Sequence, residues 1–340
     1  MKFGATPVAD ALGGIVVHAV RRDGVTLKKG HCVTAADITA LQGAGIQDIV
    51  LARLDDGDIG ENAAAQTLAR AIAGAYVRVE KPFTGRSNLF ATADGVLCID
   101  PQAIDTINEV DAAITVATLE RWRRVVDGEM IGTVKIIPFA VAGAILDKAA
   151  AAAGPAPLHV AAFSPKRIGV VSTLLPGLKP ATITKTLRVL DERIAPTGAQ
   201  VVSEVRVPHD SAALAGAIAQ MAGQCDIVIV FGASAITDRR DVIPSALEQA
   251  GGEIEHFGMP VDPGNLLLVG RIADKGRKVH VLGAPGCARS PKENGFDWVL
   301  YRLLADISVS ARDIKKMGVG GLLMEIVDRG QLREGDAADG

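Results

Sequence analysis

The stretch from Ile227 to Asp241 constrains the fold more than any other part of the chain. Five consecutive apolar residues, Ile227 to Phe231, are followed by a glycine, three small residues and a charged cluster that begins at Asp238. A short apolar run bounded by turn residues is typical of a strand buried on both faces, as in a parallel sheet. The apolar rhythm that follows, with Pro244 near its start, predicts a helix and completes a strand–loop–helix unit.

The loop of this unit is a candidate ligand site. Ligands of open α/β sheets bind where the carboxyl ends of strands meet the amino ends of helices. Gly232, Ala233 and Ser234 are small enough to let a ligand approach the backbone, and a helix amino terminus favours an anion. Asp238 and Asp241 suit Mg²⁺ binding or proton transfer. The alternative is a tight connection in which these two aspartates cap the following helix.

Strands and helices alternate throughout residues 166–306, which we expect to form one α/β domain. The pattern predicts a three-layer, mostly parallel sheet with right-handed crossovers. Two of its strands, 266–270 and 278–282, are expected to pair around the turn at Asp274–Gly276. The loops after Ser172, Phe231 and Leu282 would meet at one sheet edge, and such convergence predicts a pocket.

Residues 1–157 predict a mixed α+β region that is divisible into two subdomains. Thr34 with Asp37 three residues later predicts the start of a helix. Asp94-Gly95 between two apolar runs predicts a β-hairpin. Glycine and proline residues at 154–157 mark the boundary. Residues 307–340 are expected to form a C-terminal arm or tail.

Composition excludes several classes of function. A net charge of −3 gives no electrostatic basis for nucleic-acid binding. The four cysteines are scattered without a CxxC pair, which excludes a structural zinc motif. No signal-peptide pattern and no apolar segment of membrane-spanning length is present, so we expect a cytoplasmic protein with no membrane association. No GxGxxG follows the first strand of the α/β domain, which argues against a Rossmann-type dehydrogenase.

Four segments in order resemble the molybdopterin-binding domain family, which includes molybdopterin adenylyltransferase and molybdopterin molybdenumtransferase. Residues 230–238 are similar to the strand and small-residue loop of the molybdenumtransferase, and Arg239-Arg-Asp-Val-Ile-Pro244 resembles a motif of the adenylyltransferase. Residues 251–270 and the loop 283–290 follow the order of the molybdenumtransferase. The beginning of the chain gives a fainter similarity to the start of that enzyme.

The resemblance implies a pterin ligand, molybdopterin, bound by small-residue loops, with Mg²⁺ and ATP as further candidates. Asp238 and Asp241 would be the catalytic and metal-binding residues of an adenylyl transfer or a molybdate insertion. The implied partners are other cofactor-synthesis proteins or molybdoenzymes, and the implied assembly is a homo-oligomer. The predicted ligand-binding residues, joined by Arg289 and Lys292 as candidates to balance phosphate charge, are Gly232, Ala233, Ser234, Gly264, Asn265, Gly283, Pro285, Gly286, Ser290 and Lys185.

The chain departs from the family pattern at several places. The segment Ser172–Gly177 lacks the carboxylates that the enzymes carry after the first strand, and the usual Gly-Gly is Gly232-Ala233. The lysines that flank the Pro-Gly of the molybdenumtransferase are replaced by Asp262 and Asn265, and the acidic aromatic-rich loop expected near residues 20–30 is missing. The missing carboxylates after Ser172 favour an alternative function, a non-catalytic carrier or sensor of molybdopterin or of the molybdenum cofactor.

Overall fold

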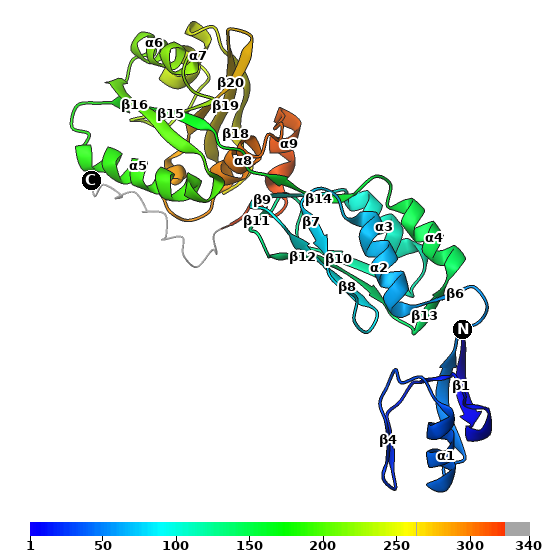
Figure 1. Ribbon diagram of the computed structural model, residues 1–340. Helices are drawn as coiled ribbons and strands as arrows, with labels where there is room; N and C mark the ends of the chain where they lie inside the picture. Colours follow the sequence, from blue (N-terminus) through cyan, green and yellow to red (C-terminus); the bar gives the residue numbers. More distant parts are fainter. Residues whose placement is uncertain (263, 324–340) are drawn as a thin grey trace, which may run out of the picture. The chain divides into compact units, whose positions relative to one another are not determined.

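Figure 1 shows a computed structural model of the chain, which describes residues 1–262 and 264–323. The chain divides into two compact units, Met1–Ala162 and Phe163–Gly340. The expected C-terminal arm lies outside the described residues from 324 onward. Its described part contains the short helix α9 (Ala311–Lys315) and the 3-10 turn η4 (Lys316–Gly318). Within the described ranges, no helix combines the length and the apolar character that crossing a membrane requires.

The first 53 residues of the first unit have a hydrophobic core of their own, which includes Val16, Leu41 and Leu51. A three-stranded antiparallel sheet in the order β1-β5-β2 and a two-stranded ribbon of β3 and β4 surround this core. The elements are β1 (Lys2–Pro7), η1 (Val8–Asp10), β2 (Ile15–Val16), β3 (Val20–Arg22), β4 (Val25–Leu27), α1 (Ala35–Gly43) and β5 (Asp48–Arg53).

The rest of the first unit is a second α+β core. Its small antiparallel sheets have the orders β10-β12-β8-β7, β11-β9-β14 and β13-β6. Apolar residues of α2, α3 and α4 pack against them. The elements are β6 (Asp58–Gly60), α2 (Glu61–Ile72), β7 (Val77–Val79), β8 (Arg86–Ala91), β9 (Gly95–Ile99), α3 (Pro101–Val110), β10 (Ile114–Thr118), β11 (Arg124–Val125), β12 (Met130–Ile136), β13 (Ala140–Ala142), α4 (Gly143–Ala152) and β14 (Leu158–Ala162).

The predicted hairpin at Asp94-Gly95 is wrong. The two flanking strands exist, but β8 pairs with β7 and β12, whereas β9 pairs with β11 and β14. Gly95 is crowded by the chain of β14, because an added Cβ atom would lie 2.2 Å from the carbonyl oxygen of Ala161. The absence of a side chain at Gly95 therefore allows β9 and β14 to pack closely, and the glycine does not form a hairpin turn.

The second unit contains one six-stranded sheet in the order β16-β15-β17-β20-β19-β18. The first four strands are parallel, and β18 and β19 run antiparallel to their neighbours. The elements are β15 (Arg167–Leu174), α5 (Pro180–Ile194), η2 (Ala195–Thr197), β16 (Gln200–Pro208), α6 (Ser211–Ala222), β17 (Ile227–Phe231), α7 (Val242–Gln249), β18 (Glu253–Met259), β19 (Asn265–Asp274), β20 (Arg277–Ala284), η3 (Gly286–Arg289) and α8 (Gly295–Leu304).

Helices cover both faces of this sheet, and the buried central strand β17 shows how. Ile227, Ile229 and Phe231 pack with residues of α5 and α8, while Val228 and Val230 pack with α6 and α7. Successive side chains of a strand point to opposite faces, so an unbroken apolar run serves two cores at once. Figure 1 shows α6 and α7 on one side of the sheet and α5 on the other.

The sheet is mixed, whereas we expected mostly parallel strands. Strands β19 and β20 pair antiparallel from Leu268 opposite Gly283 to Asp274 opposite Arg277, as the turn at Asp274–Gly276 predicted. Lys275 and Gly276 both have positive φ, 47° and 80°, the backbone of a tight two-residue hairpin turn. A two-residue turn can only join antiparallel strands, so this turn reverses the sheet direction locally.

The predicted helix start at Thr34 is confirmed as a reciprocal capping box. The Thr34 backbone N–H donates to Asp37 Oδ2 at 2.8 Å, and the Asp37 N–H donates to Thr34 Oγ1 at 3.3 Å. His31 Nε2 lies 2.7 Å from the same Asp37 oxygen. Hydrogen bonds from Thr34 and His31 lower the pKa of Asp37 to about 2.

We predict that Asp37→Asn lowers the free energy of unfolding of the first unit by about 1 kcal/mol at pH 7. The folded-state pKa is below the ordinary value of 3.8, so the carboxylate stabilises the fold above pH 4 and loses this effect as the pH falls toward 2. Urea unfolding should show the difference between wild type and variant shrinking from pH 7 to pH 3. Asp48→Asn, at an exposed position of β5, is the control. A difference independent of pH would contradict the assignment.

Candidate functional site

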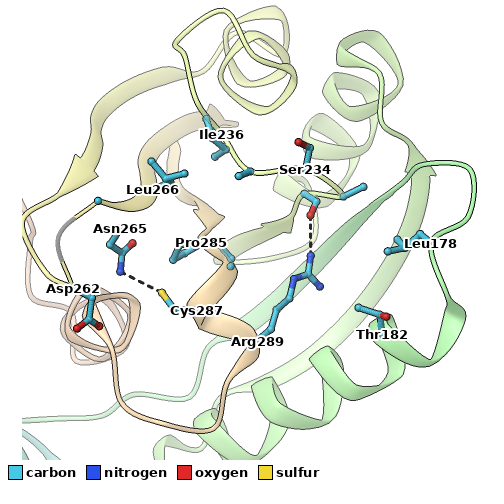
Figure 2. Close-up of a pocket in the computed structure, with 16 residues that line it drawn as sticks. Leu178, Thr182, Ser234, Ile236, Asp262, Asn265, Leu266, Pro285, Cys287 and Arg289 are labelled. Carbon is cyan, nitrogen blue, oxygen red and sulfur yellow. Dashed lines mark hydrogen bonds between the residues drawn. The ribbon is translucent and has the colours of Figure 1, made fainter. Parts of the chain in front are cut away.

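A cavity of about 530 Å³ opens at the carboxyl edge of the four parallel strands. The loops after β15, β17 and β20 line it together, and the start of β19 joins them because that strand runs in the opposite direction. Figure 2 shows these residues, which are Leu178, Thr182, Gly232, Ala233, Ser234, Ala235, Ile236, Asp262, Gly264, Asn265, Leu266, Ala284, Pro285, Gly286, Cys287 and Arg289.

The small-residue loop after β17 is held close to the neighbouring strand. The Ala233 N–H donates to the hydroxyl of the buried Thr173 at 2.7 Å, and the same hydroxyl lies 2.8 Å from His209 Nδ1. Only glycine fits at position 232, because an added Cβ atom would lie 2.7 Å from the Ser234 carbonyl oxygen. The loop therefore presents its backbone to the cavity at a fixed position.

Arg289 is the cation of the cavity wall. Its Nη1 donates to Thr186 Oγ1 and its Nη2 to the Gly232 carbonyl oxygen, both at 2.8 Å. The guanidinium carbon lies 5.3 Å from the ring centroid of Phe231. No carboxylate within residues 1–262 and 264–323 forms an ion pair with Arg289. Burial lowers the pKa of its guanidinium, yet an arginine remains charged, so the site favours an anion.

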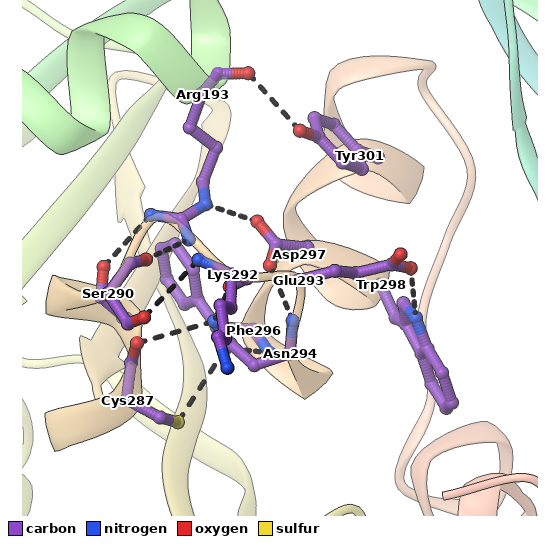
Figure 3. Close-up of polar contacts among 11 residues, drawn as sticks. Arg193, Cys287, Ser290, Lys292, Glu293, Asn294, Phe296, Asp297, Trp298 and Tyr301 are labelled. Carbon is purple, nitrogen blue, oxygen red and sulfur yellow. Dashed lines mark hydrogen bonds and ion pairs between the residues drawn. The ribbon is translucent and has the colours of Figure 1, made fainter. Parts of the chain in front are cut away.

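The loop that carries Arg289 is braced from behind by a buried ion pair. Arg193 of α5 donates through Nε to Asp297 of α8, and both side chains are about 95% buried, with exposures of 5% and 4%. The remaining nitrogens of Arg193 donate to the carbonyl oxygens of Ala288 and Ser290, at 2.9 Å and 2.8 Å. Figure 3 shows this network, in which one guanidinium connects two helices and the loop between β20 and α8.

A second chain of polar contacts joins the cavity to the start of α8. Asn265 Nδ2 lies 3.5 Å from Cys287 Sγ, which in turn donates to Asn294 Oδ1 at 3.6 Å. Asn294 caps α8 in a reciprocal capping box with Asp297. Burial raises the pKa of the Cys287 thiol and that of the Asp297 carboxyl, although Arg193 opposes the latter shift. Cys287 is therefore a neutral thiol that contributes shape and weak hydrogen bonding.

The two predicted metal-binding aspartates lie outside the lining of the cavity. Arg240 donates to both oxygens of Asp238, at 2.8 Å and 3.4 Å, and this pairing lowers the pKa of the Asp238 carboxyl. Asp241 caps α7, accepting from Val242 N–H at 2.8 Å and from Thr237 N–H at 3.1 Å. Within the described ranges, no group of three or more His, Cys, Asp or Glu side chains is arranged to hold a metal ion. Asp238 thus pairs with Arg240 and Asp241 caps α7, and their role as Mg²⁺ ligands stays a prediction.

Eight of the predicted ligand-binding residues line the cavity, namely Gly232, Ala233, Ser234, Gly264, Asn265, Pro285, Gly286 and Arg289. The others lie elsewhere: Gly283 packs between Ile236 and Leu268, the Ser290 carbonyl accepts from Arg193, and Lys185 and Lys292 are exposed. The sequence reasoning did not identify Thr182, Cys287 or Leu178 as lining residues, or Arg193 as the brace. No local pattern marks them, because their positions depend on how distant segments meet.

Comparison with known proteins identifies two regions of the chain. Residues 171–305 match the family model of a probable molybdopterin binding domain, which confirms the predicted resemblance for this part of the second unit. The match relates this region to molybdenum cofactor biosynthesis. Residues 5–53 match a domain of unknown function, DUF8806. No curated protein matches the chain.

Several solved structures have distant similarity to the chain. The molybdopterin biosynthesis moea protein from Pyrococcus horikosii is 18% identical, with a TM-score of 0.32, and the match covers 90% of this chain and 75% of that one. A molybdenum cofactor biosynthesis protein from Pyrococcus furiosus is 11% identical, with a TM-score of 0.26, over 90% of this chain and 64% of that one. These TM-scores are low, so the assignment of the second unit rests on the family match.

We predict that Arg193→Leu destabilises the second unit by about 3–5 kcal/mol, because it leaves the Asp297 carboxylate buried without a cation. The double variant Arg193→Leu with Asp297→Leu should recover much of this loss. A deficit of about 1–3 kcal/mol should remain, since the Ala288 and Ser290 carbonyl oxygens lose their donor and the buried Asn294 N–H loses its acceptor. Native-state hydrogen exchange of the β17 amides would measure the second unit separately. Equal stability of wild type and Arg193→Leu would contradict this role.

Proposed function

We propose that the second unit binds molybdopterin in the cavity at the carboxyl edge of its sheet, in the context of molybdenum cofactor biosynthesis. The observation that carries the proposal is Arg289, a cation without a carboxylate partner in the described structure, in the wall of a cavity within the matched domain. The volume of about 530 Å³ lies within the range of about 300–1,000 Å³ that is usual for small-molecule sites.

The proposed binding mode follows from the chemistry of the lining. Arg289 would hold the phosphate of the ligand, because a guanidinium is the side chain best suited to a planar array of hydrogen bonds to oxyanions. The loop Gly232–Ile236 would let the ligand approach the backbone. Ile236, Leu266 and Pro285 would pack against apolar surface of the ligand.

Between the two functions considered, the arrangement of the carboxylates favours a carrier or sensor over a transferase. An adenylyl transfer or a molybdate insertion that uses Asp238 and Asp241 requires these side chains to reach the ligand. Asp238 is instead paired with Arg240, and Asp241 caps α7. The transferase remains the second candidate, with molybdopterin as substrate and Mg²⁺ and ATP as co-reactants.

The test is binding of purified molybdopterin by the full chain. We expect Arg289→Gln to weaken binding by about tenfold or more, since a charge-assisted contact to the phosphate is lost. Arg188→Gln is the matched control, because Arg188 is exposed on α5 and does not line the cavity. Equal weakening by both variants would show only a general charge effect, and no binding by wild type would overturn the proposal.

The same preparation separates carrier from transferase. For a carrier, Asp238→Ala should bind molybdopterin as tightly as wild type, and neither protein should form an adenylylated or metallated product with Mg²⁺-ATP and molybdate. Product formation by wild type that Asp238→Ala abolishes would establish the transferase instead. Chromatography of the released pterin species measures this outcome.

A further inference from the structure

The polar groups of the cavity are divided by charge. Arg289 is fixed by Thr186 of α5 and by the Gly232 carbonyl oxygen, whereas Asp262 belongs to the segment that leads into β19. In Figure 2, Asp262 and Arg289 lie on opposite sides of Cys287, and both line the cavity. A ligand that fills the cavity therefore lies between an arginine on one side and an aspartate on the other (Figure 2).

Asp262 is held in place but retains free accepting capacity. Its N–H donates to the Gly321 carbonyl oxygen at 2.7 Å, and its Oδ1 accepts from the Leu323 N–H at 3.3 Å. No lysine, arginine or histidine of the described chain forms an ion pair with it. A carboxylate has about four lone-pair sites, so one backbone donor leaves most of them available. The residue is half-buried and has a positive φ of 42°, a backbone conformation that aspartate tolerates better than most residues.

The side chains beside Asp262 are already committed to other contacts. Asn265 Oδ1 accepts from the Leu267 N–H at 3.1 Å, and its Nδ2 points to Cys287 Sγ. The Cys287 thiol donates to Asn294. Asp262 is therefore the group at this end with the strongest capacity to accept hydrogen bonds from a ligand.

We infer that Asp262 accepts hydrogen bonds from the 2-amino group and N3–H of a 2-amino-4-oxopteridine ring, while Arg289 holds the phosphate at the other end. This inference rests on the proposed function. The two ring N–H groups are adjacent and parallel, and they match the two oxygens of a carboxylate as the two N–H groups of a guanidinium do. The charge division of the cavity thus fixes the direction of the ligand and selects pterins over pteridines that lack the amino group.

The test uses two probes that differ at position 2 of the ring, 6-hydroxymethylpterin phosphate and 6-hydroxymethyllumazine phosphate. Lumazine carries an oxygen acceptor where pterin carries the amino donor, and its N1 carries a proton, while N3–H is the same in both. Wild type should bind the pterin probe at least about tenfold more tightly, because the lumazine oxygen would face a carboxylate oxygen. Asp262→Asn should remove or reverse this preference, since its amide offers one acceptor to N3–H and one donor to the lumazine oxygen.

Controls separate this inference from the proposed function and from misfolding. Asp191→Asn, at an exposed position of α5, should keep the preference of wild type. Arg289→Gln should weaken both probes equally, leaving their ratio unchanged. Asp262→Asn should gain affinity for lumazine relative to pterin. An unfolded variant would instead lose affinity for both probes, so it cannot produce the expected result.

Two results would overturn the inference. In the first, wild type binds molybdopterin but either does not distinguish the probes or keeps its pterin preference after Asp262→Asn. Asp262 then does not bind the 2-amino and N3–H groups, while the proposed function is unaffected. If wild type binds neither molybdopterin nor the probes, both proposals fail. Titration monitored by the fluorescence of the pteridine ring gives each dissociation constant directly.

Discussion

The buried pairing of Arg193 with Asp297 is the interaction on which the candidate site depends. Burying two charges costs several kcal/mol each, and the mutual attraction compensates only when further hydrogen bonds satisfy the remaining groups. Arg193 meets this condition by donating to two carbonyl oxygens of the loop between β20 and α8, and Asp297 by accepting from the Asn294 N–H. That loop carries Cys287 and Arg289, so the position of the cavity wall follows from the ion pair behind it. Such a network specifies one arrangement of loop and helices more than it adds net stability.

The cavity combines two kinds of construction. Gly232 and Ala233 provide backbone at close range, fixed by the contact with Thr173, whereas Arg289 and Asp262 provide charges at opposite ends. The first kind is common to ligand sites at the carboxyl edge of α/β sheets. The second kind depends on the antiparallel strand β19, whose beginning brings Asp262 and Asn265 to the edge where the parallel strands end. The mixed sheet therefore places Asp262 and Arg289 on opposite sides of the cavity.

Local signals in the sequence predicted local structure well. The capping pair Thr34 and Asp37, the buried run of β17 and the turn at Asp274–Gly276 each depend on neighbours in the chain, and all three form as expected. The Asp94-Gly95 signal failed because strand partners are chosen by tertiary packing and not by the turn alone. Arg193 and Asp297 are 104 residues apart, so no spacing rule could join them. The metal-binding role of Asp238 and Asp241 stays a prediction; in the structure Asp238 pairs with Arg240, and Asp241 caps α7.

The cavity is assembled from four segments that lie between residues 178 and 289, each at the end or the beginning of a different strand. None of these segments can form the cavity without the others, so it exists only when the sheet from β15 to β20 is complete. A ligand in the cavity would contact the ends of strands that are distant in the sequence. It would therefore bind the native state and not the unfolded chain. Its binding free energy would therefore be added to the cooperative stability of the whole second unit. Occupancy of the cavity and the folded fraction of the second unit would then rise and fall together.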